Sequence, residues 1–213
     1  MNANRRSATS KPVTARGAAT RTRIVEAASR LVSVRGVGGT SLDDIMEASG
    51  TSKSQLYHYF ADRDALMCAV VEAQAAHVLD FQESCLLTVK SLADLRQWRD
   101  RIVEINRGNG CIGGCPIGSL ASELADRSES ARQLLVRSFA KWESHLAFSL
   151  GVMRDRGELL PDANPDDLAT AVIGALQGGL LLAQTTRSTR PLELALGMAL
   201  DHVARHLSRT GRR

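Results

Sequence analysis

The fold of this chain is decided by residues 40–60, which read TSLDDIMEASGTSKSQLYHYF. Thr40 or Ser41 can cap the N-terminus of a helix, and the two aspartates that follow suit the dipole of its first turn. That helix must be short, because the Ser-Gly-Thr run at 49–51 breaks it. A second short helix is expected over 52–59. The stretch therefore predicts two short helices joined by a tight turn.

The turn between these helices has the residues that a steep crossing needs. Ser49 and Gly50 are small enough for the chain to reverse, and Ile45 and Leu56 can meet beneath the crossing and fix the second helix. The other side of the second helix is left exposed. It offers short or flexible hydrogen-bonding groups suited to the major groove of DNA, namely Ser52, Lys53, Ser54, Gln55, Tyr57 and His58.

The charge of the chain is distributed unevenly. The 213 residues carry a formal net charge of +4 and 44% hydrophobic residues, which is typical of a globular protein. Residues 1–65 hold ten Lys/Arg and six Asp/Glu, whereas residues 66–213 hold seventeen of each. All the excess positive charge lies in the first third, which predicts a basic surface for phosphate on a neutral body. A protein that compacts DNA nonspecifically would need broad basic faces instead.

Residues 1–18 form a segment rich in Ser, Thr, Ala and Arg, with no acidic residue. This composition buries too little apolar surface to offset the entropy of ordering, so a disordered basic arm is expected. Its role is either a solvated tail, the interpretation that we favour, or an arm that adds phosphate contacts.

The remainder of the chain also reads as helix, without the alternation of strands or an internal repeat. Further helices are expected to begin near residues 20 and 62, to cover Ser91–Asn106, to run from a capping box at Asp126 and Glu129 to about Arg156, and to begin at Asn164 and Pro191. An all-α fold follows, with a three-helix helix-turn-helix domain over 19–66 and a second helical domain over 67–213.

The longest apolar stretch, Leu168 to Ala183, is interrupted by Gly174, Gln177 and a glycine pair at 178–179. It falls short of the ~20 residues that span a bilayer, so a buried helix is expected. With no signal peptide in the sequence, the prediction is a soluble cytoplasmic protein with no membrane partner.

Cys68, Cys85, Cys111 and Cys115 are expected to be reduced, because the chain reads as intracellular. Cys111 and Cys115 are four residues apart on a glycine-rich segment, but no neighbouring ligands complete a metal site. A thiol-based redox trigger remains an alternative, with two structural cysteines as the default. No nucleophile elbow, phosphate loop or metal-ligand cluster is found, so neither an enzyme nor a cofactor is expected.

Residues 21–66 resemble the N-terminal domain of the TetR family of bacterial transcriptional regulators. The residues that match the family pattern at fixed spacing are Thr40, Ile45, Gly50, Ser52, Leu56, Tyr57, Tyr59, Phe60 and Leu66. The departures are Met46 for Ala, Thr51 for Val, Gln55 for Thr and Arg63 for Lys. Of these, Gln55 should alter which bases are read.

The resemblance implies phosphate contacts for Tyr57 and Tyr59, and contacts to bases or nearby backbone for Lys53 and Gln55. Chemistry agrees, because glutamine can pair bidentately with adenine and lysine can reach guanine or phosphate. Phe60 is expected to pack in the domain. The predicted DNA-binding residues are Thr40, Ser41, Ser52, Lys53, Ser54, Gln55, Tyr57, His58 and Tyr59.

The resemblance extends over residues 20–207, because the segments 114–124 and 177–184 resemble a subgroup of the family. It implies that the second domain dimerises and holds a pocket for a small effector. Residues 168–183 are apolar nearly all round, which suits a homodimer through the last two helices. The candidate effector-binding residues are Phe81, Trp98, Ile102, Trp142, Leu146 and Gln177.

These observations together predict a repressor that binds double-stranded DNA at a palindromic operator. It would leave the operator when a small, largely apolar effector binds the second domain. A regulator with a redox trigger, or one that activates transcription, remains the alternative.

Overall fold

The computed structural model describes residues 15–208, and within them the chain is helical with no β-sheet. Extended residues pair only in an isolated bridge between Leu159 and Leu207. The prediction of an all-α fold is therefore confirmed. The helices in this part of the chain are α1 (Ala15–Arg35), α2 (Leu42–Ser49), α3 (Lys53–Tyr59), α4 (Arg63–Leu86), α5 (Leu92–Gly108), α6 (Pro116–Leu124), α7 (Glu129–Asp155), α8 (Pro165–Thr186) and α9 (Arg190–Arg205).

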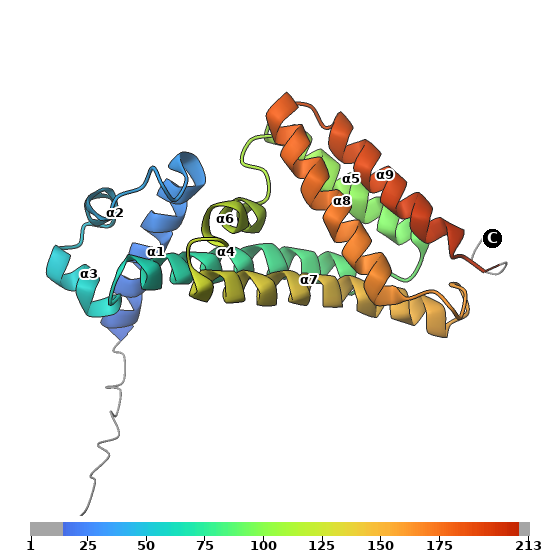
Figure 1. Cartoon of the computed structure of the whole chain (residues 1–213), viewed down its shortest axis with the longest axis horizontal. Coiled ribbons are helices and arrows are strands. Elements are labelled where there is room, and N and C mark those ends of the chain that lie inside the picture. Colours follow the sequence, from blue (N-terminus) through green and yellow to red (C-terminus); the bar gives the residue numbers. More distant parts are fainter. Residues whose placement is uncertain (1–14, 209–213) are drawn as a thin grey trace, which may run out of the picture.

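Helices α1, α2 and α3 form a small unit at one end of the molecule, which we call the head (Figure 1). Ser41 caps α2 in a reciprocal capping box with Asp44, and Gly50 ends it in the left-handed conformation (φ 61°). Ser52 then caps α3. These local signals set both ends of the turn, as the sequence predicts.

The crossing of α2 and α3 rests on a core of buried apolar side chains. Ile45 and Leu56 are fully buried in it, as expected, and Ile24 of α1 and Leu66 of α4 are buried with them. Each buried aliphatic side chain of this size contributes roughly 1.5–3 kcal/mol relative to exposure. The position of α3 is therefore fixed by packing from below, while its opposite side remains open.

Helix α1 begins at Ala15, so residues 15–18, which the sequence assigns to a disordered arm, form its first turn. Ala and Arg are good helix formers, and Thr20 adds a hydrogen bond from its hydroxyl to the Arg16 carbonyl (3.0 Å). The rest of the expected arm lies outside the described residues.

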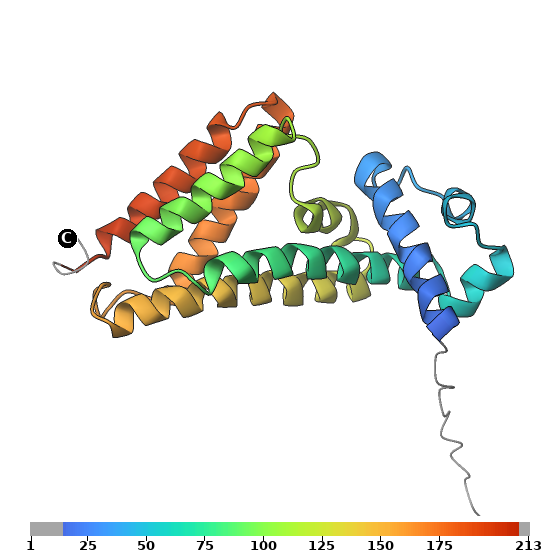
Figure 2. The same cartoon turned by 180° about the vertical axis from the view of Figure 1, so that it is seen from behind.

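Helices α4 to α9 form the body, in which α4 and α7 lie side by side over much of their length (Figure 1, Figure 2). Helix α8 packs against α7 and α9, and α6 lies over α4 between the head and the other helices of the body. Helix α4 begins under the head and continues into the body without a break. The expected division between residues 66 and 67 thus falls inside one helix.

The ends of the body helices follow local signals with one difference. Asn164 caps α8 and Pro165 occupies its first turn, as the sequence predicts. Helix α7, however, is capped by Ser128, whose hydroxyl accepts the Ala131 N–H (3.0 Å), rather than by Asp126. Both residues are favourable caps, and tertiary packing selects between them.

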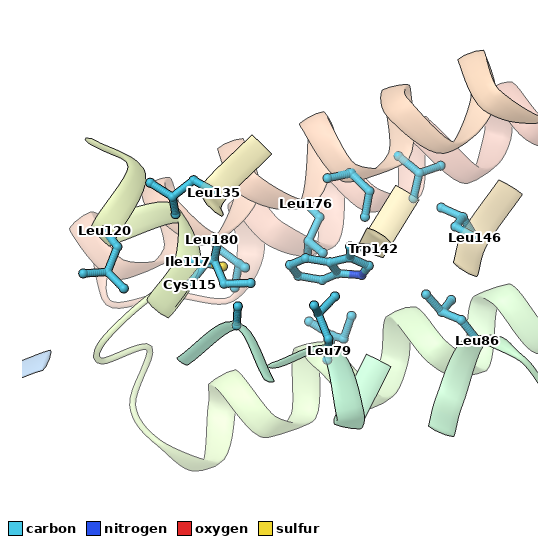
Figure 3. Close-up of a cluster of buried hydrophobic side chains, with 14 of the residues drawn as sticks. Leu79, Leu86, Cys115, Ile117, Leu120, Leu135, Trp142, Leu146, Leu176 and Leu180 are labelled. Atoms are coloured by element: carbon cyan, nitrogen blue, oxygen red, sulfur yellow. The ribbon is translucent and has the colours of Figure 1, made fainter. Parts of the chain in front are cut away.

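Trp142 lies at the centre of the body core. It projects from α7 between Leu79 of α4 and Leu176 of α8, and only 2% of it is exposed (Figure 3). Helix α8 is long and apolar enough to cross a membrane by length and composition. In this fold it packs against α7 and α9 instead.

Candidate nucleic-acid interface and cavities of the body

The open side of α3 carries the polar residues that the sequence predicts there. Lys53, Ser54, Gln55 and His58 are exposed, and 44% of Tyr57 is exposed. Leu56 points the other way and is fully buried. A short helix that is anchored from below and polar on its outer side has the form of a recognition helix for the major groove.

Gln55 already has a structural role in the DNA-free protein. Its Oε1 accepts the Ser52 N–H (2.9 Å), while the Ser52 hydroxyl accepts the Gln55 N–H (3.2 Å). This reciprocal capping box leaves the Nε2 group of Gln55 to donate outward. Bidentate pairing with adenine uses the oxygen as well, which would then accept from adenine and from the Ser52 N–H together.

The other predicted DNA-binding residues at the edge of the head are less available. Thr40 is buried, and its hydroxyl donates to the Gly36 carbonyl (2.9 Å). Ser41 is exposed but caps α2. Tyr59 is half-buried, with its ring edge-on to His58 at 4.9 Å. Of the nine residues predicted, Thr40 therefore has the clearest structural role.

Three arginines hold the head together in ways that the sequence did not reveal. Arg23 donates to the Ser49 carbonyl in the turn (2.8 Å), and the guanidinium of Arg21 lies over the ring of buried Phe60, 5.2 Å from its centroid. Arg63 donates to backbone carbonyls of the α1–α2 loop. The partners of Arg23 and Arg63 lie 23 to 26 residues away, so no local pattern marks them.

A first cavity of about 410 Å³ lies in the body between α4, α5, α7, α8 and the start of α6. It brings together three of the predicted effector-binding residues, Phe81, Ile102 and Trp142. Among the described residues that line it, none is Asp, Glu, Lys or Arg. The remaining lining residues are His77, Val78, Gln82, Ile105, Asn106, Asn109, Gly114, Cys115, Pro116, Leu176 and Leu180.

A second cavity of about 370 Å³ lies between α6, α7 and α8 and contains Gln177. It shares Cys115 and Leu180 with the first cavity, so the two meet at the start of α6. The described lining residues again include no Asp, Glu, Lys or Arg. Both volumes lie within the range of small-molecule sites.

The other two predicted effector-binding residues are core residues outside these cavities. Leu146 is fully buried. Trp98 is 3% exposed, and its Nε1 donates to the Gln82 Oε1 (2.9 Å). Gln82 lines the first cavity, so Trp98 contacts a lining residue of that cavity without lining the cavity itself.

The buried Nε1 of Trp142 has no hydrogen-bond partner in the described part of the chain, and the buried Nε2 of Gln177 has only the Cys115 thiol as a weak acceptor beside it. An unpaired buried donor costs roughly 1–3 kcal/mol. A ligand with a hydrogen-bond acceptor is one means of satisfying such a group. The surroundings of these donors therefore favour an uncharged, mainly apolar molecule that carries an acceptor such as a carbonyl.

Cys111 and Cys115 are buried free thiols, and Cys115 lines both cavities. Cys115 caps α6, where its Sγ accepts the Gly118 N–H (3.4 Å). Burial raises the pKa of the Cys115 thiol, although that N–H and the Gln177 amide oppose the shift. A protonated thiol is a poor nucleophile, so this environment does not favour the redox alternative. Within residues 15–208 no group of three His, Cys, Asp or Glu is placed to hold a metal ion.

Helices α8 and α9 each expose two large apolar side chains, which together we call the α8–α9 patch. Its members are 54–70% exposed and comprise Leu181, Leu182, Leu194 and Met198, of which Leu181 also lines the second cavity. Gly174 and Gly178 are also exposed, and a Cβ at either would meet nothing within 4 Å. No contact within the described chain therefore requires a glycine at these two positions. Gly179 differs, because a Cβ there would lie 2.9 Å from the Leu192 Cα of α9.

Comparison with known proteins assigns relatives to both parts of the chain. The family described as "Bacterial regulatory proteins, tetR family" matches residues 24–70, and the one described as "Tetracyclin repressor-like, C-terminal domain" matches residues 91–199. The first match covers most of the head and the start of α4, and the second runs from α5 into α9.

Individual relatives match over most of their length. A regulator from Lactococcus lactis subsp. lactis, described as an HTH-type transcriptional regulator in the lacX 3' region, is 31% identical over 179 residues, which are 82% of this chain and 88% of that protein. The HTH-type transcriptional repressor DhaR of Mycobacterium sp. (strain GP1) is 26% identical over 183 residues, 85% and 90% of the two chains. The crystal structure of a TetR transcriptional regulator from Chloroflexus aurantiacus J-10-FL is 26% identical, with a TM-score of 0.77 over 91% of this chain and 98% of that one.

Proposed function

Because the chain belongs to the TetR family of bacterial transcriptional regulators, we propose that it is a repressor whose homodimer binds a palindromic operator and releases it when an effector enters the body. Regulators of this family bind DNA, respond to small molecules, act as dimers and are not enzymes. The proposal places the protein in the cytoplasm, where operator DNA is present. A relative named as a repressor supports the sign of the regulation.

The observation that carries the proposal is the geometry of α3. Buried Leu56 fixes this helix from below, and its outer side presents Lys53, Gln55 and Tyr57. In a two-fold dimer, two such helices would enter major grooves one helical turn, about 34–36 Å, or a multiple of it, apart.

Selection of binding sites from random DNA tests this function. We expect an enriched inverted repeat that binds at least about a thousandfold more tightly than random DNA at physiological salt. Equal affinity for the two would rule out a sequence-specific regulator and would favour nonspecific binding through the basic head.

Gln55 supplies a prediction about which bases are read. Gln55→Ala should flatten the preference at one base pair of each half-site, a loss of roughly 1–3 kcal/mol of discrimination. Gln55→Glu keeps an acceptor for the Ser52 N–H and should shift the preference toward cytosine, because carboxylates accept from its amino group. Tyr57→Phe is the control, since loss of a phosphate contact should weaken all sequences alike. Unchanged base preferences in Gln55→Ala would contradict the reading role; binding to a full set of operator variants measures this.

The effector is proposed to be small, uncharged and largely apolar. The cavities support this, because the described lining residues include no Asp, Glu, Lys or Arg to pair with an ion, and burying an unpaired charge is costly. Burial disfavours a reactive Cys115, so the proposal retains ligand binding rather than oxidation as the trigger.

The charge of the effector can be tested with two dyes. We expect neutral Nile red to bind the body at least about tenfold more tightly than anionic 1-anilinonaphthalene-8-sulfonate, because the sulfonate would lose its hydration without gaining a charged partner. Val78→Trp fills the first cavity and should abolish Nile red binding, while Val136→Trp on the outer side of α7 should not. Fluorescence titration provides the measurement. If Nile red bound the Val78→Trp and Val136→Trp proteins with equal affinity, its site would not be the first cavity.

A further inference from the structure

The loop between α1 and α2 is tied to the body by one carboxylate. Glu123, at the end of α6, accepts the N–H groups of Val37 (2.8 Å) and Gly38 (3.3 Å) through its Oε2. Glu123 is 86 positions from Val37 and 85 from Gly38 in the sequence, so these two hydrogen bonds join the head to the body. Hydrogen bonds to an ionised acceptor are roughly twice as strong as neutral ones.

The carboxylate is seated directly against the backbone of the loop. Gly36 has a φ of +73°, and a Cβ at this position would lie 3.1 Å and 3.2 Å from the two carboxylate oxygens of Glu123. A side chain at residue 36 would therefore be both strained and crowded. The glycine that ends α1 thus also admits the anchor from α6.

The same loop is held from a second body helix. The Nη2 of Arg63, in the first turn of α4, donates to the carbonyls of Val37 (2.5 Å) and Thr40 (2.9 Å). The N–H of Val37 is thus bonded to α6 and its carbonyl to α4. Because Ser41 follows directly as the cap of α2, these bonds set where the DNA-binding helices begin.

Helix α6 connects this anchor to the cavities. Its first turn carries Gly118, and Cys115 caps it; both line the second cavity, and Cys115 also lines the first. A Cβ on Gly118 would lie 2.5 Å from the Gln177 Oε1, so this end of α6 is in close contact with α8. From Gly118 to Glu123 the helix rises only about 7.5 Å. One end of α6 therefore forms cavity wall, and the other holds the head.

We propose that Glu123 is the positioning residue through which α6 sets the orientation of the head, and with it the half-site spacing that a dimer accepts. The inference rests on the proposed function, since it concerns two heads reading one operator. Loss of this carboxylate would leave α3 intact but free the head from α6.

The test compares Glu123→Ala with Glu123→Gln and Glu129→Ala. Glutamine keeps a carbonyl oxygen for the Val37 N–H, and Glu129 is a matched exposed carboxylate whose partners, Arg132 and Gln133, lie on its own helix. Each protein is titrated with the selected operator and with the same operator carrying one extra central base pair. The insertion moves the second half-site by about 3.4 Å and turns it by roughly 35°.

Wild type, Glu123→Gln and Glu129→Ala should each lose roughly tenfold or more in affinity on insertion, within the usual range for coupled sites. Glu123→Ala should lose less than about threefold, because its heads can adjust to the new spacing. A Glu123→Ala protein that discriminates between the two operators as wild type does would overturn the proposal.

Hydrogen exchange gives a second readout that needs no DNA. The amides of Val37 and Gly38 should exchange at least about tenfold faster in Glu123→Ala alone, while the Ile45 amide within α2 stays protected. Unchanged exchange at Val37 would overturn the role of Glu123, and so would loss of protection at Ile45, which would mean that the head unfolds. If wild type selected no operator, the proposed function would fail, and exchange alone would decide whether Glu123 anchors the head.

Discussion

Replacing both Leu181 and Leu194 by aspartate is expected to convert the dimer into single chains and to weaken operator binding by roughly a hundredfold or more. Both residues belong to the α8–α9 patch and are more than 60% exposed. In a dimer each leucine would gain about 1.5–3 kcal/mol from burial, and each aspartate would instead place a charge in an apolar contact. Light scattering gives the mass, and titration of the selected operator gives the affinity.

A matched variant separates loss of the dimer from a general effect of surface charge. Val136→Asp changes an apolar residue on α7 that is 53% exposed, outside the α8–α9 patch. It should remain a dimer and bind DNA as wild type does. A Leu181→Asp, Leu194→Asp protein that keeps twice the mass of one chain would exclude this face as the dimer contact.

Leu56→Ala is expected to disrupt the head and so abolish operator binding, while the protein remains a dimer. Leu56 is fully buried beneath the α2–α3 crossing, so its truncation should cost roughly 2–5 kcal/mol and release α3 from its position. The α8–α9 patch lies in the body, away from this core, so the dimer mass should not change (Figure 1). Operator titration, hydrogen exchange over α3 and light scattering measure the three parts of the prediction.

Ser54→Ala is the control for Leu56→Ala, because it removes a hydroxyl group from the exposed side of the same helix. It should lower affinity only modestly and leave exchange in α3 unchanged, since exposed substitutions usually change stability by less than about 0.5 kcal/mol. Wild-type operator affinity in Leu56→Ala would show that the position of α3 does not depend on this core.

The head could be predicted closely from the sequence because its signals are local. Ser41 and Ser52 cap helices three residues before their partners, and Gly50 takes the left-handed conformation that ends α2. The helix crossing that Ser49 and Gly50 allow also places Ile45 and Leu56 in the core. Each of these features depends on residues within the stretch 41–56.

The features that escaped prediction depend on contacts between distant parts of the chain. Nothing near Glu123 in the sequence indicates that its carboxylate binds the loop at Val37. Trp98 is a candidate effector-binding residue by sequence, and in the structure its indole N–H donates to Gln82, sixteen residues earlier. The sequence pattern of an aromatic residue on a helix is the same whether its side chain lines a cavity or packs in the core beside one.

The continuity of α4 has a consequence for exchanging heads between proteins of this family. The helix runs from Arg63 to Leu86 without a break, so any junction between a foreign head and this body falls in or next to one rigid rod. Each residue added or removed within that rod turns the head by about 100° around the helix axis and shifts it by about 1.5 Å. A working chimera must therefore keep the number of residues in this helix unchanged, so that the head keeps its rotation and height relative to the body.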